Sequence, residues 1–245
     1  MGPFTIKKFY YLCKAIAKVR ISEQYQNIFK QFFERMINLN AIKNIFFDLG
    51  EVLISLDRER CIKEFQKLGI DNIEQHIGNS FKSGLFFQLE EGTITPETFR
   101  STIREMTHKT VTDEQIDHAW NRFLVDIAPQ KLELLRKLRK QYRVFMLSNT
   151  NKIHFDYMVH HSFDGKSGYS MSDYFEKCYL SYELHLSKPD KAIFEAVICD
   201  ANVIPQESLF LDDNLQNIRC AKELGFHTYF VDGNSDFTKE FDILL

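Results

Sequence analysis

The sequence predicts an α/β fold: a Rossmann-like parallel sheet with helices on both faces and an inserted helical cap. Short runs rich in aliphatic and aromatic residues, typical of buried parallel strands, recur after residue 41 and alternate with helical patterns. After the first such run comes a mostly helical stretch of roughly 70 residues, which is too long for a crossover helix alone. We therefore expect this stretch to form a cap inserted into the sheet domain.

This pattern divides the chain into three parts. We expect an N-terminal helical extension over residues 1–40, a core formed by residues 41–57 and 128–245, and a helical cap over residues 58–127. The extension has apolar residues at helical spacing among several basic residues. Such a helix could pack on the body of the protein, which we favour, or lie on a membrane surface. Met36 is also a candidate natural start.

Composition limits the possible functions. The chain has 245 residues, of which 44% are hydrophobic and 27% charged, and its net charge is −3. No excess of positive charge is available to neutralise phosphates, so we expect no nucleic-acid partner. The five cysteines are scattered without a Cys-x-x-Cys pair, which favours reduced thiols in a cytoplasmic protein. No window approaches the roughly 18 apolar residues of a spanning helix.

The predicted elements follow in order along the chain. The strand-type runs are "IKNIFFDLG" (42–50), "YRVFMLSNT" (142–150), "KCYLSYEL" (177–184), "SLFLDD" (208–213) and "HTYFVDG" (227–233). The helical segments between the later runs are "PQKLELLRKLRKQ" (129–141), "DKAIFEAVICDA" (190–201) and "LQNIRCAKELG" (215–225). Strands that alternate with helices in this way are typical of right-handed crossovers in a parallel sheet.

Two cap helices carry start signals. Thr95 precedes Pro96 in "TITPETFRSTIREM", which predicts a helix with Thr95 as the N-cap and proline in the first turn. In "VTDEQIDHAWNRFL", Thr112 is followed three residues later by Gln115, which predicts a capping box.

Polar residues follow the strand-type runs at their carboxyl ends. Asp48 ends the first run, the pair Ser148 and Asn149 the second, and the pair Asp212 and Asp213 a later one, with Lys188 on a loop between them. Each alone could be a helix cap, a turn or solvated surface. In an open α/β sheet, however, these ends face one crevice where ligands bind. We therefore expect the polar residues to converge there.

In this order the motifs resemble the signature of the haloacid dehalogenase-like hydrolases. That signature is an Asp after the first strand, a Ser or Thr after the next, a Lys, and a final acidic pair. The matching segments, within residues 42–233, are "FFDLGEVL" (Asp48), "VFMLSNTN" (Ser148), "SKPDKAIFE" (Lys188) and "LFLDDNLQNIRCAKELG" (Asp212, Asp213). In detail they are similar to the subgroup that includes α-D-glucose-1-phosphate phosphatases.

The resemblance implies a Mg²⁺-dependent phosphomonoesterase acting on small phosphorylated metabolites, in particular sugar phosphates. Asp48 would be the nucleophile that forms an aspartyl-phosphate. Ser148, the Asn149 backbone and Lys188 would bind the phosphoryl oxygens. The metal ligands implied by the resemblance are Asp48, the Gly50 carbonyl, Asp213, and Asp212 either directly or through water.

Gly50 departs from the pattern of most phosphatases of this family. Their sequence at this point resembles Asp-x-Asp, and the second acid protonates the leaving group. Three explanations remain open. The leaving group could need little protonation, as the anomeric oxygen of a sugar 1-phosphate does. Glu51 or a cap residue could donate the proton instead, or the site could be catalytically weak.

Substrate choice is expected to depend on the cap, where Phe86, Phe87, Glu90 and Trp120 are candidates. For the two phenylalanines, packing within the cap is the favoured interpretation. Two other functions stay open: a metal-independent 2-haloacid dehalogenase, against which the acidic pair argues, and a non-catalytic binding module. His185, beside Lys188, is taken as a loop residue.

Overall fold

The computed structural model describes residues 41–77, 84–163, 168–233 and 236–241. The chain divides into two units between Asn40 and Ala41, and all the described residues belong to the second unit. The helical extension predicted over residues 1–40 lies outside the described residues. No described helix combines the length and apolar character needed to cross a membrane.

A five-stranded parallel sheet forms the centre, in the order β5-β4-β1-β6-β7. This arrangement confirms the predicted Rossmann-like sheet. The strands are β1 (Asn44–Phe47), β4 (Arg143–Ser148), β5 (Lys177–Leu180), β6 (Ser208–Asp212) and β7 (His227–Phe230).

The central strand β1 is apolar because it is covered on every side. Ile45, Phe46 and Phe47 have no exposed surface, and β1 pairs with β4 on one edge and β6 on the other. The Phe46 ring stacks on Phe145 with a centroid distance of 4.7 Å. At the carboxyl end, the Asp48 amide donates to the Leu211 carbonyl at 2.9 Å, which aligns the ends of β1 and β6.

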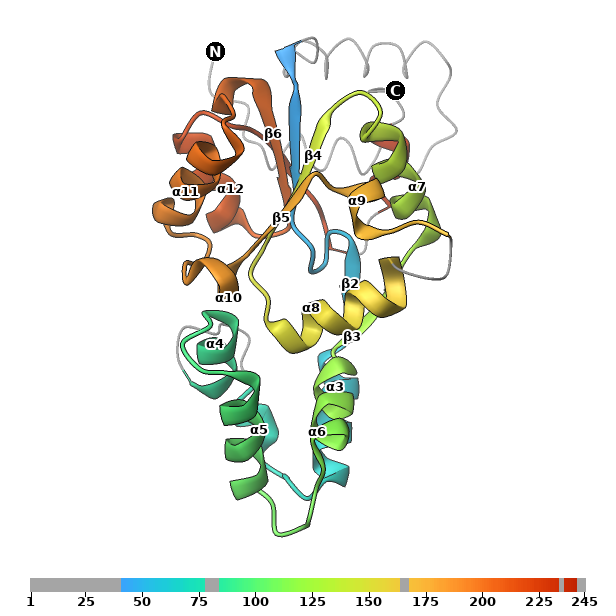
Figure 1. Cartoon of the computed structure of the whole chain (residues 1–245), viewed down its shortest axis with the longest axis vertical. Helices are drawn as coiled ribbons and strands as arrows, with labels where there is room; N and C mark the ends of the chain where they lie inside the picture. The colour runs from blue at the N-terminus through green and yellow to red at the C-terminus, as the bar shows by residue number, and fades with distance from the viewer. Residues whose placement is uncertain (1–40, 78–83, 164–167, 234–235, 242–245) are drawn as a thin grey trace, which may run out of the picture. The chain divides into compact units, whose positions relative to one another are not determined.

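Helices cover both faces of the sheet. In Figure 1, α11 and α12 lie on one side of it and α7 and α9 on the other. The α-helices of this region are α7 (Pro129–Leu138), α8 (Lys152–Met158), α9 (Met171–Tyr174), α10 (Ser181–Leu184), α11 (Lys191–Ala201), α12 (Leu215–Glu223) and α13 (Thr238–Phe241). The short helices η3 (Val159–Phe163) and η4 (Pro205–Glu207) complete it.

A helical insertion, defined here as residues 58–123, lies between β2 (Ile54–Leu56) and β3 (Leu124–Ile127). Its elements are α3 (Arg58–Lys67), η2 (Ile73–Gln75), α4 (Leu85–Glu90), α5 (Pro96–Glu105) and α6 (Asp113–Asn121). In Figure 1 the chain leaves β1 toward β2 and the insertion, which therefore lies on the side of the sheet's carboxyl ends. The antiparallel pairing of β2 with β3 was not predicted from the sequence.

The start signals of the insertion helices are confirmed. The Thr95 hydroxyl accepts the Thr98 N–H at 3.2 Å, and Pro96 begins α5. Thr112 and Gln115 form the reciprocal capping box of α6, with N···O distances of 3.3 and 2.9 Å.

One element differs from its prediction. The strand expected over residues 177–184 ends at Leu180, and α10 begins at Ser181. The Ser181 hydroxyl accepts the Thr150 N–H at 2.9 Å. This side chain therefore connects the start of α10 to the loop after β4, and Ser181 does not continue the strand. His185 ends α10 in the left-handed conformation, with φ of 53°.

Candidate active site

Three charged side chains from distant parts of the chain meet at the carboxyl edge of the sheet. Lys188 Nζ lies 2.8 Å from Asp48 Oδ1 and 2.8 Å from Asp212 Oδ2. All three residues are buried, and Ser148, at the end of the neighbouring β4, is buried as well. The predicted convergence of Asp48, Lys188 and Asp212 is thus present in the structure.

Asp212 is held by hydrogen bonds on both carboxylate oxygens. Its Oδ1 accepts the Asn214 N–H at 2.7 Å, and Oδ2 accepts from Lys188. The Asn217 amide donates to both oxygens at 3.0 Å. This role of Asn217 was not predicted from the sequence. The residue follows Asp212 by five positions and lies in the first turn of α12. A carboxylate so fully engaged is fixed in orientation.

Three carboxylates crowd together here. Asp48, Asp212 and Asp213 each offer an oxygen, and these oxygens lie within 4.8 Å of one another. Asp48 Oδ1 accepts the Leu49 N–H at 2.7 Å as well as Lys188, and among the described residues no hydrogen bond is made to Oδ2. Asp213 is half-buried. Carboxylate oxygens in this arrangement are the ligands that Mg²⁺ prefers.

The charges of the cluster do not balance. Burial raises the pKa of Asp48 to about 8, against the lowering effect of Lys188, and Asp212 adds a further rise. Burial and the neighbouring Asp212 also raise the pKa of Asp213 to about 6. Burial by itself would lower the pKa of Lys188, but Asp212 and Asp48 raise it. Among the described residues, the three carboxyl groups thus share the Lys188 ammonium, and a divalent cation bound beside them would favour their ionised forms.

Asn149 contributes its side chain to the positioning of Lys188. Its amide Nδ2 donates to the Lys188 carbonyl at 2.9 Å, and its Oδ1 accepts the Lys188 N–H at 2.9 Å. The sequence predicted a role for the Asn149 backbone alone, as a donor to phosphate. The paired hydrogen bonds fix the backbone from which the Lys188 ammonium extends.

Gly50 lies in the tight turn between β1 and β2. Its carbonyl accepts the Val52 N–H at 2.7 Å, and a carbonyl has a second lone pair for another partner. A Cβ at this position would lie 3.2 Å from Leu56 Cδ1. The adjacent Glu51 accepts the Leu56 N–H through Oε1 at 3.0 Å, so its carboxylate is directed toward β2.

The four candidate residues of the insertion differ in their surroundings. Phe86 and Trp120 have no exposed surface and pack together in the insertion's core, with ring centroids 4.7 Å apart. Trp120 also stacks on His154 at 4.2 Å. Neither ring is open to a sugar face, so packing is their role; Phe87 is half-buried. Glu90 differs, because burial raises the pKa of its carboxyl to about 8.

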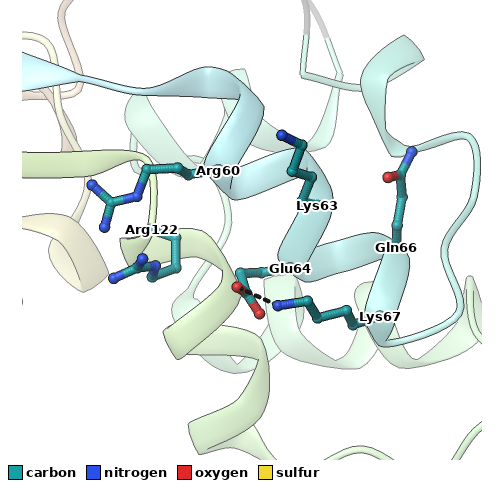
Figure 2. A pocket seen from close by; sticks show the side chains of 6 residues that line it. All are labelled: Arg60, Lys63, Glu64, Gln66, Lys67 and Arg122. Carbon is teal, nitrogen blue, oxygen red and sulfur yellow. Dashed lines mark hydrogen bonds and ion pairs between the residues drawn. The ribbon is translucent and has the colours of Figure 1, made fainter.

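A hollow of about 440 Å³ lies elsewhere, on the surface of the insertion (Figure 2). Its lining residues are Arg60, Lys63, Glu64, Gln66, Lys67 and Arg122. Glu64 and Lys67 pair with each other at 2.8 Å, and in Figure 2 the Arg60 and Arg122 side chains extend to the same side. None of the residues predicted for the site lines this hollow.

Comparison with known proteins gives consistent results. A sequence model described as "haloacid dehalogenase-like hydrolase" matches residues 42–225. The D-ribitol-5-phosphate phosphatase of Bacteroides thetaiotaomicron is 36% identical over 204 residues, which are 83% of this chain and 98% of that protein. A crystal structure of a haloacid dehalogenase family enzyme from the same organism, in complex with magnesium and inorganic phosphate, is 50% identical. It covers 82% of this chain and 99% of its own, with a TM-score of 0.77.

A more distant structure shares the fold alone. The L-2-haloacid dehalogenase of Xanthobacter autotrophicus is 19% identical, with a TM-score of 0.54 and coverage of 83% of this chain and 82% of its own.

Proposed function

Because this chain belongs to the haloacid dehalogenase-like hydrolase family, we propose that it is a Mg²⁺-dependent phosphatase of small sugar or polyol phosphates. The observation that carries the proposal is the cluster of Asp48, Asp212 and Asp213 beside the ammonium of Lys188. Two similar proteins support it: one is named for D-ribitol 5-phosphate, and the other was crystallised with magnesium and phosphate.

The donor set fits Mg²⁺. We assign Asp48, Asp213 and the Gly50 carbonyl as direct ligands, because Asp48 Oδ2 and the second lone pair of Gly50 are available. Asp212 would act through water, since both of its oxygens already accept hydrogen bonds. The bound cation would supply positive charge beside the phosphoryl oxygens.

The residues of the chain would then carry out the transfer. Two unit charges about 3 Å apart repel by roughly 5 kcal/mol at an effective dielectric constant of 20, so a carboxylate approaching a phosphate needs compensation. Lys188 provides part of it. Asp48 attacks phosphorus while the ester P–O bond breaks, and the resulting aspartyl-phosphate is hydrolysed by water. Ser148 would donate a hydrogen bond to the phosphoryl group.

Substitution of the nucleophile tests this function. Asp48→Asn should reduce phosphate release from D-ribitol 5-phosphate by about 10³-fold or more, because the amide cannot form the acyl phosphate. Circular dichroism should show an unchanged fold. The matched control is Asp71→Asn, at an exposed position on the insertion, which should keep full activity.

The assay should be run over a panel of sugar and polyol phosphates, with Mg²⁺ and with EDTA. Wild-type turnover by the Asp48→Asn variant would contradict the covalent mechanism. Halide release from 2-chloropropionate in EDTA, without phosphate release, would instead support the dehalogenase alternative.

A further inference from the structure

Two of the proposed metal ligands lie close together in the chain. Asp48 follows the last residue of β1, and Gly50 comes two residues later. The Asp48 carboxylate can be turned by rotation of its side-chain bonds, whereas the Gly50 carbonyl belongs to the main chain. The direction of this carbonyl therefore depends on the contacts that hold the turn between β1 and β2.

Backbone hydrogen bonds close this turn. The Leu49 carbonyl accepts the Ile54 N–H at 2.9 Å, and the Glu51 N–H donates to the Ile54 carbonyl at 2.8 Å. Inside the turn, the Val52 N–H donates to the Gly50 carbonyl at 2.7 Å. A movement of the Val52 backbone would therefore also move the donor that contacts the Gly50 carbonyl.

The residue between these two has a strained backbone. Glu51 has φ of 55°, in the left-handed region that residues other than glycine rarely adopt. Such a conformation persists only where the surrounding structure holds it in place. The hydrogen bond from the Leu56 N–H to the Glu51 carboxylate is one such contact, and it lies on the β2 side of the turn.

A buried lysine from a distant helix provides another contact. Lys131, in the first turn of α7, donates through Nζ to the Val52 carbonyl at 2.6 Å, across 79 residues of sequence. Lys131 is 8% exposed, and Val52 has no exposed surface. The hydrogen bond therefore lies inside the protein, where a carbonyl that loses its donor is costly.

The surroundings of Lys131 suit an ammonium that stays in place. Lysine is almost never fully buried unless its charge has partners. The Phe237 ring centroid lies 5.3 Å from Nζ, within the range of a cation–π contact. Burial lowers the pKa of Lys131, against the raising effects of Asp236 and Glu51. The lysine is thus held by several groups while it donates to the turn.

We propose that Lys131 is a positioning residue of the metal site; this rests on the proposed function. Its ammonium holds the Val52 carbonyl, and the Val52 N–H in turn holds the Gly50 carbonyl that we assign to Mg²⁺. Two hydrogen bonds thereby connect α7 with a metal ligand of the main chain. Partners of this kind orient the ligands of a metal, and loss of one typically weakens metal binding about 10- to 100-fold.

The test measures Mg²⁺ binding directly, by isothermal titration calorimetry. Lys131→Met keeps the apolar stem but not the donor, and its dissociation constant for Mg²⁺ should be about 10-fold higher than that of the wild type. Lys131→Gln, whose side chain is shorter than that of lysine, should show the same rise and replaces the methionine variant if that one does not fold. Lys137→Met, the same change at an exposed position of α7, is the matched control and should bind Mg²⁺ as the wild type does.

Activity distinguishes positioning from a part in the reaction. At saturating Mg²⁺, the kcat and KM of Lys131→Met for D-ribitol 5-phosphate should lie within about 3-fold of the wild-type values, because excess Mg²⁺ restores occupancy. Thr112→Ala, which removes a helix cap in the insertion, is the control for a general loss of stability. Its dissociation constant for Mg²⁺ should not change.

Several results would overturn the inference. An unchanged dissociation constant in the Lys131 variants, or an equal rise in Thr112→Ala, would contradict it. A kcat that stays low at saturating Mg²⁺ would mean that Lys131 acts on the chemistry, and failure of both variants to fold would mean that it serves the fold. A wild type that neither binds Mg²⁺ nor releases phosphate would instead refute the proposed function.

Discussion

Two neutral amides hold the charged residues of the site in place. The Asn149 side chain forms hydrogen bonds with both the N–H and the carbonyl of Lys188, and the Asn217 amide donates to both oxygens of Asp212. The ammonium of Lys188 therefore reaches Asp48 from a fixed loop and against a fixed counter-charge. Uncharged partners achieve this without changing the net charge that a metal ion or a phosphate meets.

A buried histidine is the second notable residue, at the junction of the insertion and the core. His154 is 5% exposed, lies 3.1 Å through Nε2 from the Trp120 carbonyl oxygen, and stacks on the Trp120 ring. Burial lowers its pKa to about 3, against the raising effect of the hydrogen bond to the Trp120 backbone. The folded protein therefore keeps this imidazole neutral at pH values where the unfolded chain protonates it.

This difference predicts a loss of stability in acid. Since the folded pKa lies below the unfolded value of about 6.5, the contribution to stability falls as the pH drops through 6.5 toward 3. Between pH 7 and 5 the free energy of unfolding should fall by about 2 kcal/mol more in the wild type than in His154→Phe. Urea unfolding at both pH values measures it. The exposed His108, changed to Phe, is the control, and equal slopes for His154→Phe and wild type would contradict the prediction.

Among the elements, the insertion helices depend on their caps as well as on their core. α6 carries Trp120 on its buried side and begins with the capping box of Thr112 and Gln115. The capping box satisfies two backbone N–H groups that have no partner within the helix. The cap therefore helps to hold the helix whose tryptophan contacts the core.

Removal of this cap should have a moderate cost. Thr112→Ala should lower the free energy of unfolding by about 1 kcal/mol, because the Gln115 N–H loses its acceptor. The measurement is urea unfolding followed by circular dichroism. Thr110→Ala, at an exposed position just before the helix, should change stability by less than about 0.5 kcal/mol. A similar small effect for both variants would show that the capping box is not stabilising.

For the molecule as a whole, the unbalanced charge of the site links metal binding to stability. Three clustered carboxylates repel one another in the folded state, and within the described part of the chain Lys188 is the cation that pairs with them. A cation bound there would relieve the repulsion, and a ligand that binds only the folded state stabilises it.

Magnesium should therefore raise the melting temperature. At a Mg²⁺ concentration 100 times the dissociation constant, the stabilisation is about 2.7 kcal/mol. Differential scanning calorimetry with Mg²⁺ and with EDTA measures the effect. Asp213→Asn should weaken it by removing one ligand, whereas Asp71→Asn should not. An identical melting temperature with and without Mg²⁺ would refute the proposed metal site.

The sequence by itself determined the features that depend on local pattern. The runs before Asp48, Ser148 and Asp212 predicted buried parallel strands, and parallel strands necessarily place their carboxyl ends at one edge of the sheet. The helix starts at Thr95 and Thr112 could also be predicted from the sequence, because capping involves residues only three positions apart.

The tertiary structure decided what depends on contacts between distant segments. The Asn149 amide meets Lys188 across 39 residues, and Ser181 meets Glu90 across 91, so no local pattern could indicate either bond. The antiparallel pairing of β2 with β3 likewise joins the two ends of the insertion. The raised pKa of Glu90 likewise depends on its surroundings, because burial shifts a pKa and the sequence does not specify which neighbours exclude water.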